Sequence, residues 1–190
     1  MLTTSYTTVA NCAAFAPFRM SPTETNCPVA EGCRFATVPG PANGAAIIPN
    51  GFTHVEGRTN HSSGAFQGDT ALLSLDTGHS VVHIGDYAAE GASNLAAVRF
   101  GSSVESIGTR AFHGTALETL VLPDSLTRVG ASAFEGVSSL RSVVFGSSVA
   151  TIEANAFAGT SLSSVALPAS LSSLGSGAFP ADTKVCGPSN

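Results

Sequence analysis

Hydrophobic and polar positions repeat along most of this chain with a period of 22 or 23 residues. The clearest marker is an Ala-Phe pair, found at Ala65-Phe66, Ala111-Phe112, Ala133-Phe134, Ala156-Phe157 and Ala178-Phe179, with Ala88-Ala89 as a degenerate copy. A period of this size is typical of a solenoid, in which each coil buries its apolar face only against its neighbours. The pattern therefore predicts a stack of coils.

Each regular coil carries the spacing Leu-x-x-Val/Leu-x-Phe/Leu, starting at Leu95, Leu117, Leu140 and Leu162. Alternation at its last two apolar positions predicts a short β-strand, and stacking aligns these strands in a parallel sheet, about 4.8 Å apart. Either glycine (Gly101, Gly146) or proline (Pro123, Pro168) follows. We expect both to end the strand, glycine by tolerating a positive φ and proline by lacking an N–H.

A second apolar pair follows each predicted strand, at Val104/Ile107, Leu126/Val129, Val149/Ile152 and Leu171/Leu174. We expect this pair to form a second buried edge ahead of the Ala-Phe turn, and the recurring phenylalanines to stack inside the coils. The predicted fold class is a solenoid with short parallel strands on one face and short turns or 3-10 segments on the other.

The pattern divides the chain into three parts: an N-terminal cap or linker (1–45), the solenoid (46–180) and a C-terminal end segment (181–190). Val55 lies ten residues before Ala65, whereas Val129 lies four residues before Ala133, so six residues are inserted within Glu56 to Ser63. Such an insertion loops out from one face, often the binding face. Neutral loop variation is the alternative.

Charge and composition exclude several classes of function. Charged residues make up only 11% of the chain, the net charge is −5 and Lys184 is the sole lysine, so no nucleic-acid partner is expected. No apolar run reaches the roughly 18 residues that cross a bilayer, so membrane insertion is not predicted. The first residues have no basic residue ahead of their weakly apolar part, so a signal peptide is not predicted there, and the chain is expected either to be cytosolic or to begin at a mature or trimmed end. Low lysine with many Ser and Thr still favours an extracellular or cell-surface location.

Three of the four cysteines, Cys12, Cys27 and Cys33, precede the repeat, and Cys186 follows it. A disulfide needs Cα atoms within about 7 Å, whereas five or so stacked coils would separate Cys186 from the N-terminal segment by about 25 Å. We therefore expect one bridge among the first three, with Cys27 as the favoured participant, and an unpaired Cys186.

The histidines do not form a recognisable metal site. His79 and His83 are four residues apart, with His61 in the preceding coil, but zinc requires a third and fourth donor. They are interpreted as surface residues, and no metal or cofactor is predicted. No nucleophile–base arrangement is recognisable either, so the chain is not expected to be an enzyme.

The stretch from Leu117 to Gly136 resembles the BspA-like leucine-rich repeats, with the pattern Leu-x-x-Leu-x-Leu-Pro-x-Ser-Leu-x-x-Val-Gly-x-x-Ala-Phe-x-Gly. The resemblance implies a leucine-rich-repeat solenoid, found largely in surface or secreted proteins of bacteria and protists, many of them suspected adhesins. That family has no shared catalytic residues. Its frequent cysteine between the glycine and the next leucine is replaced here by Ala92, Thr115, Val137 and Thr160.

The outward positions of the predicted strands are the candidate ligand-binding residues: Ser74, Asp76, Ala97, Arg99, Thr119, Val121, Ser142, Val144, Ser164 and Ala166. Asp76 and Arg99 lie on neighbouring coils, where they can pair. The sequence thus favours a protein-recognition or adhesion module, whose partner is a protein or a surface. Two alternatives remain: an ice- or surface-binding solenoid that uses small residues on a flat sheet, and a structural spacer.

Overall fold

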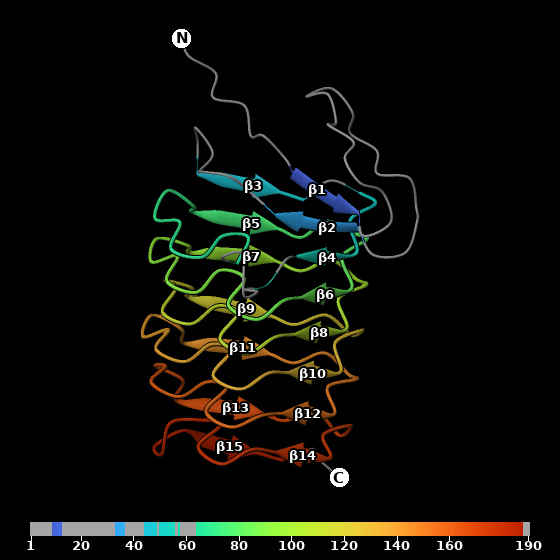
Figure 1. Cartoon of the computed structure of the whole chain (residues 1–190). Coiled ribbons are helices and arrows are strands. Elements are labelled where there is room, and N and C mark those ends of the chain that lie inside the picture. The colour runs from blue at the N-terminus through green and yellow to red at the C-terminus, as the bar shows by residue number, and fades with distance from the viewer. Residues whose placement is uncertain are drawn as a thin grey trace.

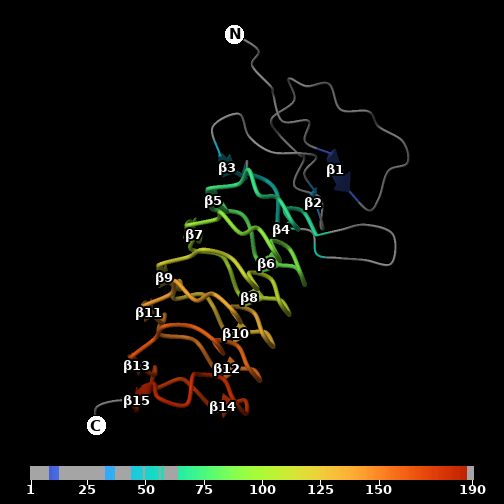
Figure 2. The same cartoon turned by 90° about the vertical axis from the view of Figure 1, so that its left-hand side faces the viewer.

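The protein is a stack of coils in the computed structural model. The structure describes residues 9–12, 33–36, 44–48, 50–55, 57 and 64–187. Strands lie in two columns along the stack (Figure 1), and the coils follow one another in chain order when the molecule is turned (Figure 2). We call the strands of one column the front strands and those of the other the back ladder. The insertion predicted within Glu56 to Ser63 lies, apart from Gly57, outside the described residues.

The front strands are β3 (Ala45–Ile47), β5 (Ser74–Asp76), β7 (Ala97–Arg99), β9 (Thr119–Val121), β11 (Ser142–Val144), β13 (Ser164–Ala166) and β15 (Lys184–Cys186). The back ladder consists of β1 (Val9–Cys12), β2 (Cys33–Ala36), β4 (His54–Val55), β6 (His83–Ile84), β8 (Ser106–Ile107), β10 (Arg128–Val129), β12 (Thr151–Ile152) and β14 (Ser173–Leu174). The last front strand, β15, lies within the segment 181–190.

The back ladder is one hydrogen-bonded sheet in the order β1-β2-β4-β6-β8-β10-β12-β14. Strand β1 pairs antiparallel with β2, and β2 pairs parallel with β4 of the first coil. In the back-ladder strands β4, β6, β8, β10 and β12 the second residue is buried, as at Ile107 and Val129, because it occupies the second apolar position of the repeat. Leu174 of β14, which the sequence placed in the same buried edge, is instead 47% exposed, because the stack ends there. The described residues contain turns on this side and no 3-10 segment. The expected buried edge is therefore itself a parallel β-ladder.

The front strands form three separate hydrogen-bonded groups, β3-β5-β7, β9-β11 and β13-β15. Both interruptions fall at a step of 22 residues, from Ala97 to Thr119 (119−97) and from Ser142 to Ser164 (164−142). The regular 23-residue step from Thr119 to Ser142 (142−119) keeps its ladder. The 20-residue step from Ser164 to Lys184 (184−164) also keeps its ladder, so the number of residues in a coil does not by itself decide whether neighbouring front strands pair.

The glycines that end the front strands act differently from the prediction. Positive φ angles belong to other glycines, such as Gly114 at +68° and Gly136 at +72°, and not to Gly101 or Gly146. A Cβ atom on Gly101 would instead overlap the carbonyl oxygen of Gly78 in the preceding coil. Glycine is therefore needed at this position because two backbones approach closely.

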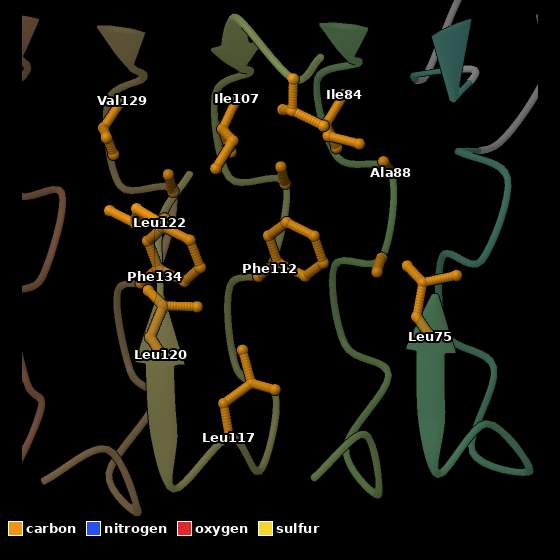
Figure 3. Packing of buried hydrophobic residues seen from close by; sticks show 14 of the residues in the cluster. Leu75, Ile84, Ala88, Ile107, Phe112, Leu117, Leu120, Leu122, Val129 and Phe134 are labelled. Atoms are coloured by element: carbon orange, nitrogen blue, oxygen red, sulfur yellow. The ribbon is translucent and has the colours of Figure 1, made fainter. Parts of the chain in front are cut away.

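A column of phenylalanine rings fills the core between the two strand columns. Phe112 stacks on Phe134 with centroids 5.4 Å apart, and Phe157 stacks on Phe179 at 5.3 Å. Figure 3 shows the rings of Phe112 and Phe134 side by side in the interior. The predicted internal ladder is confirmed, and it stops at Ala89, which replaces the ring one coil before Phe112.

The part of the chain that the structure describes holds no helix long and apolar enough to cross a bilayer.

Candidate binding face

The ten predicted site residues lie on the outer side of the strands β5, β7, β9, β11 and β13, which we call the front face. Strand geometry explains this, because alternate residues point to opposite sides of a sheet. Leu75, Leu120 and Val165, in the middle of their strands, are buried. Their neighbours on the front face are exposed, except Ser74 and Asp76, which are half-buried.

Two aliphatic side chains lie next to each other on the front face. Val121 and Val144 are register partners on β9 and β11, and they are 65% and 55% exposed. Single exposed apolar residues are common, whereas contiguous apolar patches of more than a few hundred Å² are typical of binding surfaces, and this pair is the apolar part of the front face of β9 and β11. Ala166 continues the same row one coil further on.

Uncharged hydroxyl groups form a second row beside the aliphatic one. Thr119 and Ser142 are register partners on β9 and β11, both exposed, and Ser164 occupies the equivalent position of β13. A hydroxyl group both donates and accepts hydrogen bonds. This part of the front face therefore offers apolar contact and hydrogen bonding, and the front-face residues of β9, β11 and β13 carry no charge.

An ion pair occupies the other part of the front face. Arg99 Nη1 lies 2.8 Å from Asp76 Oδ2, which confirms the pairing expected from the sequence. Burial raises the pKa of the Asp76 carboxyl, but the Gly78 N–H that it accepts at 2.8 Å and the Arg99 guanidinium outweigh burial, so the pKa is lowered overall. Because the Arg99 side chain is 70% exposed, the pair contributes little to stability.

The structure adds residues to the front strands that sequence reasoning missed. Ile47 is 71% exposed and pairs in register with Asp76. The sequence contained a signal for the outward position of Ile47, because Ile47-Ile48-Pro49 matches Val121-Leu122-Pro123. At the other end Lys184 and Cys186 are register partners of Ser164 and Ala166.

The histidines are distributed over different surfaces. His83 Nδ1 lies 2.7 Å from Ser106 Oγ on the back ladder, and its ring centroid lies 4.8 Å from that of His54, a pairing that the insertion obscured in the sequence. His79 lies in an exposed turn, and His61 is outside the described residues. The described residues contain no group of three or more His, Cys, Asp or Glu side chains that could hold a metal.

Cys186 is exposed and unpaired, as the sequence predicted. Cys27 lies outside the described residues, and for Cys12 and Cys33 only the backbone is described.

This stack of coils, with its inward leucines and phenylalanine column, is a leucine-rich-repeat solenoid. The pattern described as the BspA type leucine rich repeat region matches residues 59–185 in six copies. The chain therefore belongs to the BspA-type leucine-rich repeat family. A search of curated proteins found no match.

Solved structures share the fold. The pneumococcal vaccine antigen PcpA is 25% identical with a TM-score of 0.66, over 80% of this chain and 44% of that one. The leucine-rich repeat protein TpLRR of T. pallidum is 25% identical with a TM-score of 0.64, over 85% and 80% of the two chains. A leucine rich cell surface protein from Faecalibacterium prausnitzii is 20% identical with a TM-score of 0.51, over 94% and 51%, and shows the fold alone. This chain thus spans about half or less of the pneumococcal and Faecalibacterium proteins.

Proposed function

We propose that the front face recognises a protein partner, and that the chain is an adhesion or recognition module of a cell-surface or secreted protein. The observation that carries this proposal is the aliphatic pair Val121 and Val144, exposed side by side in register. The fitting partner is an uncharged protein surface with aliphatic or aromatic side chains, edged by groups that hydrogen-bond to Thr119 and Ser142.

The chemistry of the front face supports a protein partner over the other classes. A phosphate-rich ligand needs clustered positive charge, and Arg99 on this face is neutralised by Asp76. Binding between proteins is carried by desolvated apolar contacts near the centre of an interface, with polar groups around them. The valine pair with its neighbouring hydroxyl row has that layout, but Arg99 is the only front-face side chain of the Trp, Tyr and Arg types that carry most binding energy, so a weak interaction is expected. No catalytic activity is proposed for this face.

The extracellular location is part of the same proposal. Its support is the family to which the chain belongs, together with the similarity to a pneumococcal vaccine antigen. An ice-binding surface is less well supported, because an ion pair and breaks between hydrogen-bonded groups interrupt the front strands.

The proposal can be tested by removing the aliphatic pair. The parent chain and the double variant Val121→Ser/Val144→Ser would be applied to an array of purified extracellular and matrix proteins. Leu174→Ser is the matched control, because Leu174 is also exposed (47%) but lies on the back ladder. We expect the double variant alone to lose binding. Equal binding by all three chains would refute the proposal, and thermal hysteresis shown by the parent chain would favour an ice surface instead.

A further inference from the structure

The register of the first two strands brings two cysteines together. Strands β1 and β2 pair antiparallel, with Val9 opposite Ala36 and Cys12 opposite Cys33. Cα atoms of directly opposed residues in antiparallel strands lie about 4.5–5.5 Å apart. That separation is within the range of about 4.4–6.8 Å that a disulfide requires.

From this register we infer that Cys12 and Cys33 form a disulfide bridge in the oxidised protein, and that Cys27 remains a thiol. The pairing differs from the one favoured by the sequence, in which Cys27 took part. Sequence position alone left the three pairings open, whereas the strand register favours one of them. Cys186 is not a competitor, because it lies on β15, at the opposite end of the stack (Figure 1).

The bridge would fasten the N-terminal end of the back ladder. Strand β2 is the rung between β1 and β4, where Arg34 pairs with His54 and Phe35 with Val55. A covalent link between β1 and β2 keeps the antiparallel β1–β2 pair next to the parallel β2–β4 pair. An unpaired ladder edge is a template for other strands, so fixing β1 there keeps the edge of β2 covered and makes β1 the terminal strand of the sheet.

The chemistry requires an oxidant of an ordinary class. Two thiols lose two protons and two electrons to form the S–S bond, and a small-molecule disulfide such as oxidised glutathione takes them up and becomes two thiols. An oxidising compartment supplies such a disulfide.

Peptide mapping distinguishes the pairings without any variant. The full chain would be equilibrated with reduced and oxidised glutathione, its free thiols alkylated, and the product cut after Lys, Arg and Glu. Each cysteine then falls on its own peptide: 1–19, 25–31, 32–34 and 185–190. We expect peptide 1–19 joined to 32–34, with 25–31 and 185–190 alkylated. A link that includes 25–31, or four alkylated peptides, would overturn the inference.

Variants and hydrogen exchange test the consequence for the fold. Cys27→Ser should keep the bridge, whereas Cys12→Ser should abolish it. On loss of the bridge, the amides of β4 should lose protection while those of β10, further along the stack, keep theirs, because coils couple to their neighbours. Equal protection of β4 with and without the bridge would refute the fastening role.

Discussion

The rings of Phe134 and Phe157 lie parallel within 8°, with their centroids 5.2 Å apart. Both side chains are fully buried. Each ring is therefore packed against a ring of the next coil. The column joins neighbouring coils through contacts between residues that are far apart in the sequence.

Removing one ring from the column should destabilise the solenoid. We expect Phe134→Ala to lower the free energy of unfolding by about 3–5 kcal/mol, because it deletes a buried aromatic side chain and leaves a cavity. Urea unfolding measures this, and hydrogen exchange should show the loss first in adjacent coils. Phe179→Ala is the matched control with a smaller cost, since Phe179 is only half-buried. An unchanged unfolding midpoint for Phe134→Ala would contradict the packing role of the column.

A left-handed residue recurs before each Ala-Phe turn of the regular coils. Arg110, Ser132 and Asn155 have φ angles of +54°, +55° and +58°, and in the last coil Gly177 takes the equivalent place at +64°. The left-handed conformation costs a non-glycine residue roughly 1–2 kcal/mol, against about 0.5–1 kcal/mol for the greater freedom of glycine in the unfolded chain. We expect Ser132→Gly to raise the free energy of unfolding by up to about 1 kcal/mol, and Ser132→Val to lower it. A less stable glycine variant would be inconsistent with strain at this turn.

The Asp76–Arg99 pair predicts a pH dependence with a definite sign. Because the pKa of Asp76 is lowered from its ordinary value of 3.8, its contribution to stability is present above that value and is lost as the pH falls through the lower folded pKa. Because the pair is exposed, we expect the parent chain to melt only slightly above Asp76→Asn at pH 7, and this small difference to disappear in acid. Melting curves at a series of pH values measure it. A difference that stays constant down to pH about 2 would contradict the assignment.

Most of the fold could be predicted from the sequence, because a solenoid depends on contacts between neighbouring coils. The stacking of Phe112 on Phe134 follows from the period alone, and the burial of Leu120 between Thr119 and Val121 follows from strand alternation. The interruption between β7 and β9 could not be predicted, because hydrophobic spacing does not record whether the backbones of neighbouring strands pair. The role of Gly101 was misjudged for a similar reason, since the approach of two backbones is a property of the stack.

The candidate site was only partly predictable. The period places Val121 and Val144 on one row, but their exposure depends on what covers the front face in three dimensions. His54 and His83 are register partners on β4 and β6, because the residues inserted after Val55 do not change the pairing of these two strands. That register comes from the structure and not from counting along the chain.

The most direct test of the front face as the binding surface is a pair of affinity measurements on a partner found with the protein array. Ser142→Arg places a long charge at the centre of the front face, and Ser173→Arg places the same charge on an exposed position of the back ladder. Surface substitutions of this kind change folding stability by only about 0.5 kcal/mol, which circular dichroism would check. We predict that Ser142→Arg weakens binding at least about tenfold, equivalent to roughly 1.4 kcal/mol, and that Ser173→Arg leaves it unchanged. Unchanged affinity for Ser142→Arg would contradict the account and would direct attention to residues 56–63.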